Sequence, residues 1–189
     1  MAVALGHESD GDQRVIEAAR RGDPAAFAAL AARNGDWVRG VIFGVLGNHD
    51  ELDDVAQQVW TTVWHQLDRL RDVRCWRSWL YRLARNAALD AGRDQARRRE
   101  VCGNGIAMPE TAYADAGPAA RVVAGEQAGV VMQAIRDLPP LYREPFVLRH
   151  VQGWSYAQIA EVMGLPVDTV ETRLVRARRR LRACLKGRV

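Results

Sequence analysis

The sequence predicts an all-α protein made of two small helical domains joined by a flexible linker, with a helix-turn-helix in the C-terminal domain. Apolar residues recur at three- and four-residue spacing through almost every segment, and no sustained apolar–polar alternation marks a strand. Residues 101–125 interrupt this pattern with Ala, Gly and two Pro, a composition typical of an interdomain linker. The expected organisation is an N-terminal extension over 1–22, one domain over 23–100 and a second over 126–189.

The first domain is expected to open with a helix at Asp23 and Pro24, because Asp is a favoured N-cap and Pro is favoured at the first helical position. The following apolar block ends at Gly47, where the turn chemistry stops a helix. Residues 50–70 form the next predicted helix, with apolar side chains at three- and four-residue spacing that indicate one buried stripe. That stripe consists of Leu52, Val55, Val59, Val63, Leu67 and Leu70.

The other faces of the 50–70 helix carry polar side chains beside two large aromatic residues, Trp60 and Trp64. The polar positions are Asp53, Asp54, Gln57, Gln58 and Thr61. This composition fits a solvated acidic face whose tryptophans are tucked into the core, and it fits equally a protein-docking surface. The residues alone leave both interpretations open.

The last helix of the first domain is predicted from Trp76 to Arg99, with Trp76 and Trp79 on its apolar side and seven arginines along it. Aromatic residues interleaved with arginines suit single-stranded nucleic acid, because bases stack on rings and guanidinium groups hold phosphates. Taken alone, such a helix is more often a core helix with a solvated basic side.

A helix-turn-helix pattern occupies residues 154–174. Ser155 is a favoured N-cap for the first helix, and Gly164 permits the tight turn between the helices. Either Pro166 or Asp168 can start the second helix. At 100° per residue, one side of that second helix is apolar and the opposite side points outward. The apolar residues are Val170, Leu174, Ala177 and Leu181, and the outward residues are Glu171, Thr172, Val175, Arg176 and Arg179.

Positive charge is concentrated at the C-terminal end. Residues 166–189 carry eight basic and two acidic side chains, a net charge of +6, whereas the whole chain carries +4. Such a patch predicts binding to a polyanion, and an ordinary helical hairpin does not need six arginines in its second helix. On the outward face Arg can bond guanine and Glu can accept from cytosine, while Arg173 and Arg180 are better placed for phosphates.

Several classes of protein are disfavoured by the composition. The three cysteines, Cys75, Cys102 and Cys184, show no paired spacing, and the four histidines show no ligand spacing, so we expect no disulfide, metal or cofactor. No apolar run approaches the roughly 18 residues of a membrane span. The N-terminus turns polar and acidic too early for a signal peptide. We therefore expect a cytoplasmic protein without membrane insertion.

The stretch from Leu138 to Arg182 strongly resembles region 4 of the extracytoplasmic-function (ECF) sigma factors, including a T-V-x-x-R-L-x-R-A-R sequence at Thr169 to Arg178. Asp53 to Trp60 (DDVAQQVW) is similar to the region 2 helix that docks on RNA polymerase. Trp76 to Asn86 (WRSWLYRLARN) resembles the segment that melts and reads the minus-10 element. Together the two regions cover residues 23–182 in the expected order, and two modules are more specific than one.

The resemblance implies a sigma factor that binds core RNA polymerase at the β′ clamp coiled coil and the β flap, binds promoter DNA, is held by an anti-sigma factor and catalyses nothing itself. The implied polymerase-binding residues are Asp53, Asp54, Gln57, Gln58, Trp60 and Thr61. The implied minus-10 residues are Arg71, Asp72, Val73, Arg74, Trp76, Arg82 and Asn86. The implied minus-35 residues are Ser155, Tyr156, Glu171, Thr172, Arg173, Val175, Arg176, Arg179 and Arg180.

Two positions depart from the family pattern: Gln58 stands where Glu is usual, and Glu171 stands where a basic residue is common. Core affinity and promoter sequence are the properties that these departures affect. A helix-turn-helix response regulator or repressor is one rival, although the first domain shows no phosphoacceptor or ligand pocket. A cysteine hydrolase is another, although no Cys, His and Asp share a motif.

Overall fold

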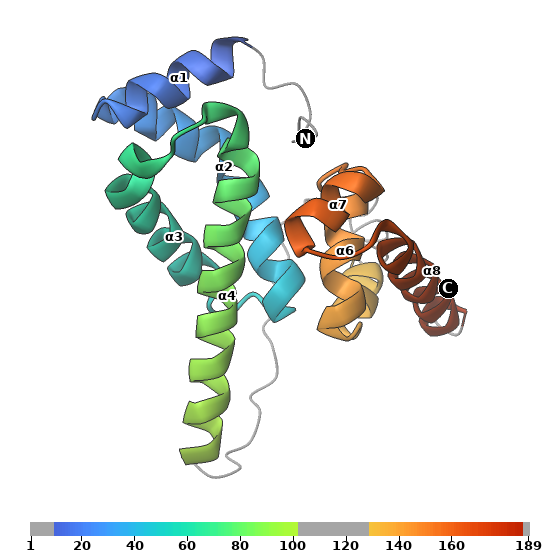
Figure 1. The fold of residues 1–189 in the computed structure, drawn as a ribbon. Coiled ribbons are helices and arrows are strands. Elements are labelled where there is room, and N and C mark those ends of the chain that lie inside the picture. Colours follow the sequence, from blue (N-terminus) through green and yellow to red (C-terminus); the bar gives the residue numbers. More distant parts are fainter. Residues whose placement is uncertain (1–9, 102–128, 187–189) are drawn as a thin grey trace, which may run out of the picture.

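The computed structural model describes residues 10–101 and 129–186, and all regular structure in these two stretches is helical. The expected all-α class is therefore confirmed. Figure 1 shows α1 to α4 as one group, with α6 and α7 beside it and α8 on their far side. The expected linker lies outside the described residues except for Val101, which ends α4.

The first two helices are α1 (Asp10–Arg20) and α2 (Pro24–Leu46). Both predicted ends of α2 are confirmed: the Asp23 carboxylate accepts hydrogen bonds from two backbone amides, and Gly47 adopts a left-handed conformation with φ of 77°. Helix α1 lies within the stretch expected as an extension. Its Ile16 is fully buried in the core, so part of that stretch belongs to the folded body.

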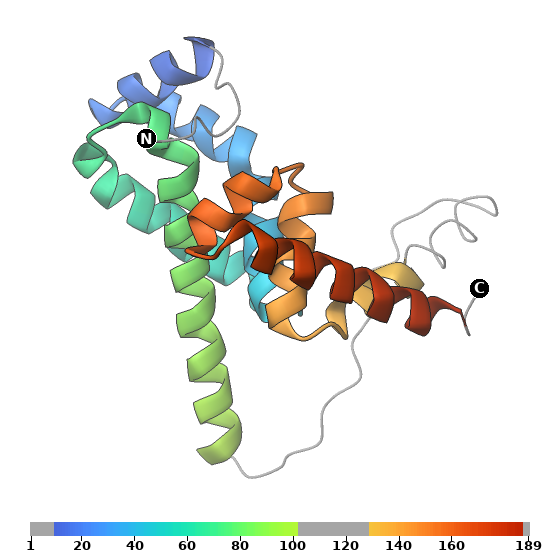
Figure 2. The same ribbon diagram turned by 45° about the vertical axis from the view of Figure 1, so that its right-hand side comes forward.

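Helix α3 (Leu52–Gln66) is followed by two 3₁₀ turns, Leu67–Arg69 and Val73–Cys75, and by the long helix α4 (Trp76–Val101). All six residues of the predicted apolar stripe are buried, as their spacing requires. In Figures 1 and 2 the distal half of α4 extends away from the body.

The C-terminal group contains a helix over 129–136, α6 (Pro140–His150), α7 (Tyr156–Met163) and α8 (Val167–Leu185). The helix-turn-helix prediction is confirmed in detail. Ser155 and Gln158 form a capping box at the start of α7, and Gly164 is left-handed with φ of 64°. Pro166 is the N-cap of α8. The buried residues of α8 are the four apolar residues predicted from the 100° spacing along this helix.

The two groups share a core, because α6 packs along α2 and α7 contacts α4. Helices α2 and α6 approach each other closely at Gly44, where a β-carbon would make ordinary van der Waals contact at 3.6 Å with the Glu144 backbone and with Val147. The Trp154 ring, just before α7, lies 5.9 Å from Trp37 of α2 and 5.6 Å from Tyr81 of α4. These contacts place the helix-turn-helix directly against the N-terminal group.

Candidate nucleic-acid and polymerase interfaces

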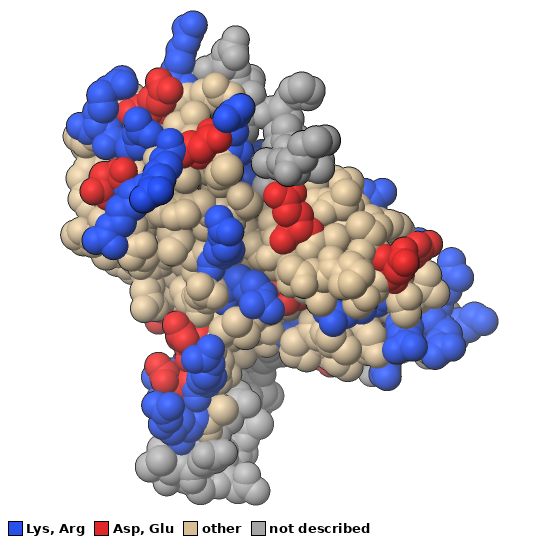
Figure 3. All heavy atoms as spheres, in the orientation of Figure 1, with Lys and Arg blue, Asp and Glu red and all other residues tan. Residues whose placement is uncertain are grey.

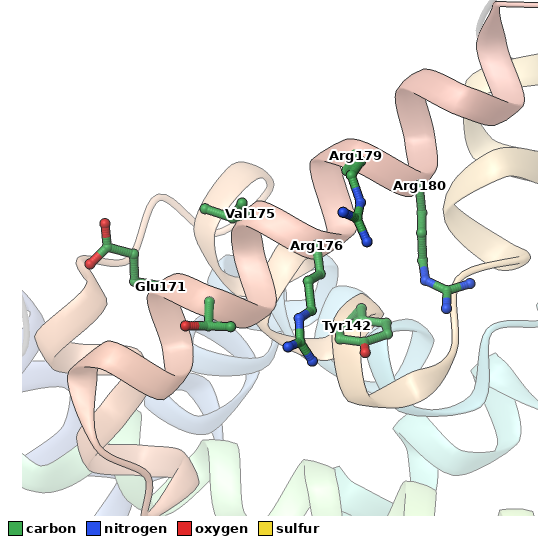
Figure 4. Close-up of a pocket in the computed structure, with 7 residues that line it drawn as sticks. Tyr142, Glu171, Val175, Arg176, Arg179 and Arg180 are labelled. Atoms are coloured by element: carbon green, nitrogen blue, oxygen red, sulfur yellow. The ribbon is translucent and has the colours of Figure 1, made fainter.

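The outward face of α8 borders a shallow groove of about 640 Å³ (Figure 4). The lining residues are Tyr142, Glu171, Thr172, Val175, Arg176, Arg179 and Arg180. Six of these were predicted as minus-35 residues from the helical wheel and the resemblance. All six are exposed, while the opposite side of α8 is buried, so packing within the chain leaves this face accessible.

Tyr142 is a member of this groove that the sequence did not predict. It comes from the first turn of α6, and the Arg180 guanidinium lies 5.4 Å from its ring centroid. Figure 4 shows Arg176 and Arg180 extending from α8 toward this tyrosine. A ring under a guanidinium restrains the cation without neutralising it. No sequence signal distinguishes Tyr142 from any aromatic residue of an amphipathic helix.

Ser155 and Tyr156 mark the start of α7 at one side of the helix-turn-helix. The Ser155 hydroxyl accepts from the Gln158 amide at 3.2 Å, so its first role is to cap the helix. Arg149 donates to the Trp154 carbonyl at 2.7 Å and lies 5.1 Å from the Tyr156 ring centroid. Arg149 thus adds a positive charge beside two predicted minus-35 residues.

The field of these arginines acts on His150 at the end of α6. Partial burial, together with the nearby charges of Arg178 and Arg149, lowers the pKa of His150. The imidazole is therefore neutral at pH 7, and the positive charge of this region comes from arginine and lysine. Figure 3 shows basic side chains gathered over the α8 end, at the right of the view. A concentrated positive field of this kind attracts a polyanion.

The predicted minus-10 segment is ordered by a local ion pair. Arg74 donates through its backbone amide and through its guanidinium to the Asp72 carboxylate, each at 2.9 Å. These bonds hold the pKa of Asp72 below its ordinary value, so it stays charged. Arg71, Arg82 and Arg74 remain exposed, as does Asn86 in the next turn of α4.

Trp76 corrects one of the minus-10 expectations. Trp76 is only 2% exposed, and its ring centroid lies 5.7 Å from that of Trp79 in a tilted arrangement, inside the N-terminal core. A buried ring cannot receive an unstacked base, so Trp76 supports the segment from within. Trp79 and Val73 are only partly buried. Which of these rings is accessible depends on how α4 packs against α2 and α3, which the aromatic pattern alone does not reveal.

The predicted polymerase-binding residues lie together on one exposed side of α3. Asp53, Asp54, Gln57, Gln58 and Thr61 are all exposed. Asp53 pairs with Arg39 of α2 at 2.9 Å, and the Thr61 hydroxyl donates to the Gln57 carbonyl at 3.0 Å. The Asp53 side chain is still 83% exposed in this pair, so the carboxylates of Asp53 and Asp54 and the two glutamine amides are all accessible on this surface.

Trp64 of α3 is not tucked into the core as the solvated-face interpretation required, whereas Trp60 packs against the core and stays partly exposed. Trp64 is 43% exposed, and its ring meets Phe27 of α2 edge-on at 4.8 Å. Trp60 is half-buried and contacts the same phenylalanine at 6.1 Å. An exposed aromatic cluster beside a polar face is typical of a docking surface, because large apolar side chains are otherwise costly in water.

Within residues 10–101 and 129–186, no three His, Cys, Asp or Glu side chains come close enough to hold a metal ion. None of the described helices is both long and apolar enough to cross a membrane.

The geometry defines a class of protein: a helix-turn-helix protein whose first helical group carries a basic helix with aromatic residues and an exposed polar face on α3. Comparisons with known proteins are more specific. Residues 30–98 match the family described as Sigma-70 region 2, and residues 128–181 match Sigma-70, region 4.

Curated relatives match over nearly the whole chain. The chain is 33% identical to the ECF RNA polymerase sigma factor SigW of Bacillus subtilis, covering 90% of this chain and 95% of SigW. It is 30% identical to the ECF RNA polymerase sigma-E factor of Haemophilus influenzae, covering 88% and 91%. This chain therefore belongs to the ECF family of RNA polymerase sigma factors. It is a transcription initiation factor and not an enzyme.

Solved structures share the fold. A structure of CnrH in complex with the cytosolic domain of CnrY has a TM-score of 0.68 at 27% identity, covering 95% of this chain and all of CnrH. The sigma factor RpoE, solved with the anti-sigma factor NepR from Bartonella quintana, has a TM-score of 0.66 at 22% identity, covering 86% and 98%. The likeness to RpoE concerns the fold alone.

Proposed function

We propose that three surfaces of this chain divide the work of a sigma factor. The exposed side of α3, with its aromatic cluster, binds the β′ clamp coiled coil of core polymerase. The segment from Leu70 to Asn86 captures the minus-10 element, and the outward face of α8 reads the minus-35 element. Residues 23–100 and 126–189 act as the two modules, and the second also meets the β flap.

The observation that carries this proposal is the groove beside α8. The basic residues of the groove are exposed, whereas Val170, Leu174 and their neighbours on the opposite side of α8 are buried. The basic face therefore does not contribute to the core of the fold. A helix seated in this way inserts its N-terminal turns into the major groove. There Arg176 and Thr172 would meet base edges, and the arginines farther along would meet phosphates.

We infer that a separate protein holds this factor inactive until a signal arrives. The inference is supported by the two similar folds described above, since RpoE was solved with an anti-sigma factor and CnrH with the cytosolic domain of CnrY. The exposed cluster of Phe27, Trp60 and Trp64 is the surface that such a protein would need to cover to block polymerase. We place the chain in the cytoplasm, where polymerase and promoter DNA are.

A transcription assay with purified components tests the proposal. The chain is mixed with core RNA polymerase and genomic fragments, and run-off transcripts are sequenced to find their start sites. The expected result is promoter-specific transcription that requires both the chain and core polymerase. Specific binding of the chain alone to a duplex operator, with no effect on polymerase, would instead support a repressor.

A further inference from the structure

A buried carboxylate joins the two groups of helices. The Tyr81 hydroxyl and the Arg85 Nε of α4 both donate to Glu144 Oε1 of α6, each at 2.5 Å. A third donor atom, Arg85 Nη2, lies 3.4 Å from Glu144 Oε2. The Glu144 side chain is only 9% exposed, so its charge is balanced by Arg85 rather than by water. Ionic hydrogen bonds of this kind are short and directional.

Neighbouring contacts fix the position of Glu144. The adjacent Arg143 is buried and donates to the α2 carbonyls of Gly44 at 3.0 Å and Val45 at 2.7 Å. Gly47 leaves room for this guanidinium, because a β-carbon at that position would collide with it. Arg143 therefore fastens α6 to the end of α2, and Glu144 is held against α4 as a consequence.

Arg85 stands at the edge of the predicted minus-10 surface. On a helix of 3.6 residues per turn, Arg85 lies about 40° from Tyr81 and about 60° from Arg82. Tyr81 faces the C-terminal group, whereas Arg82 and Asn86 are exposed. Arg85 therefore lies between the buried interface and the exposed residues assigned to minus-10 DNA, and its guanidinium donates to Glu144.

We propose that Arg85 is a phosphate contact of the minus-10 surface, and that Glu144 occupies its guanidinium in place of a DNA phosphate until the two groups separate. The proposal rests on the proposed function of the Leu70 to Asn86 segment. A carboxylate and a phosphate offer a guanidinium the same paired oxygen acceptors, so one can replace the other. The free chain thus keeps one cation of its DNA-binding surface masked.

The promoter geometry requires this separation. The path from the proposed minus-10 surface to the proposed minus-35 surface runs from Trp76 to Tyr81, crosses to Trp154, and follows α7 and α8 to Arg176. The summed length of these segments is at most about 65 Å. The centres of the minus-10 and minus-35 elements are about 25 base pairs apart, or about 85 Å at about 3.4 Å per base pair. Because the closed arrangement is shorter than this separation on straight DNA, we expect binding of both elements at once to break the contact between Arg85 and Glu144.

Binding of the free full-length chain to a fluorescein-labelled, random-sequence single-stranded 20-mer tests the masking. Glu144→Gln keeps the size of the side chain and an acceptor for Tyr81 but removes the charge. One newly available cation should steepen the slope of log K against log salt by about 0.7, which is about fivefold in affinity at about 0.1 M salt. Arg85→Ala alone should change little, and Arg85→Ala in the Glu144→Gln background should abolish the gain.

Arg82→Ala is the matched control, because Arg82 is exposed on the same helix and should lose the same affinity in both backgrounds. A gain in Glu144→Gln that persists without Arg85, or no gain at all, would overturn the masking. Circular dichroism establishes that each variant is folded.

The holoenzyme provides the second measurement. With core polymerase bound, the groups should be apart, and Arg85→Ala should weaken binding of a forked promoter fragment even when Glu144 is present. If Arg82→Ala weakens binding of the promoter fragment and Arg85→Ala does not, Arg85 is not a phosphate contact, while the assignment of the segment to minus-10 DNA is kept. If neither variant has an effect, the proposed function of the segment itself fails.

Discussion

Two arginines one turn apart on α8 illustrate how position decides function at the scale of single residues. Arg176 lines the groove beside Thr172, within reach of base edges. Arg180 lies farther along, and its guanidinium is stacked over Tyr142. We therefore expect Arg176 to read sequence and Arg180 to hold phosphate, and the two substitutions to fail in different ways.

Replacing Arg176 with Ala should weaken binding to the cognate minus-35 element by about 1 to 3 kcal/mol, because a bidentate contact to a base is lost. Preference should relax at one base pair only. The measurement is holoenzyme binding across a library of minus-35 sequences. Unchanged preference at every position would show that this face of α8 does not enter the major groove.

Replacing Arg180 with Ala should weaken binding to all DNA sequences by the same factor. It should also reduce the slope of log K against log salt by about one unit, because one contact to a duplex phosphate is lost. Titrations at several salt concentrations measure this. Tyr142→Ala removes the ring beneath the Arg180 guanidinium, and it should also weaken binding to all DNA sequences, by a smaller factor. A loss confined to one sequence would assign Arg180 to bases instead. Both arginine variants should keep their helicity, since neither side chain is on the buried face of α8.

At the scale of elements, α3 separates its two tasks by face. Its apolar stripe is buried in the core, and its polar side is free of contacts that the fold requires apart from the pair between Asp53 and Arg39. Surface changes on that side should therefore alter binding without altering stability. The same separation makes the docking assignment testable.

The double variant Asp54→Arg and Gln57→Arg should abolish co-purification with core polymerase. The two arginines reverse the negative charge of this face of α3, and their longer side chains obstruct the contact. Thermal unfolding should stay near that of the native chain, since both positions are exposed. The matched control is Asp68→Arg, an exposed position beyond the end of α3. Unchanged recovery of polymerase by the folded double variant would refute the docking surface.

The turn between Leu70 and Trp76 is the element assigned to strand separation. Substituting Arg71 or Asn86 with Ala should reduce open-complex formation more than closed-complex binding, because both side chains are exposed where unstacked bases would lie. Permanganate reactivity reports the open complex, and gel shift reports the closed one. Equal losses in both assays would argue that these residues only add affinity for duplex DNA.

At the scale of the whole molecule, the two groups of helices are held in one body by buried polar contacts as well as by apolar packing. Arg143 donates to four carbonyl oxygens, of which two belong to α2 and two to its own group. Burial lowers the pKa of its guanidinium, but Glu144 beside it favours the charged form. The two groups should therefore unfold together in the free chain.

Arg143→Ala should separate the unfolding of the two groups. Calorimetry of the native chain should give one transition, and the variant should give two, with a loss of about 3 kcal/mol or more because buried acceptors are left unpaired. Arg182→Ala, an exposed change on α8, is the control and should leave the single transition intact. A single transition in Arg143→Ala would mean that apolar contacts alone couple the groups.

Much of the fold could be predicted from the sequence because its signals are local. Asp23 and Pro24 start α2 by capping chemistry, Gly47 and Gly164 end helices by their left-handed backbone, and the apolar spacing of α3 and α8 specifies which faces are buried. These effects depend on residues within a few positions of one another. The resemblance added the order of the two regions.

The sequence by itself therefore determined both ends of α2, the buried stripe of α3, the helix-turn-helix and the outward face of α8, but it did not reveal α1. Only the tertiary structure decided that Trp76 is buried, that Tyr142 lies under Arg180, and that Arg143 and Glu144 lie between the groups. The reason is that these outcomes depend on segments distant in sequence. An Arg and a Glu in a helix are normally exposed, and here the packing of α6 against α2 and the bonds from α4 to Glu144 make their burial favourable.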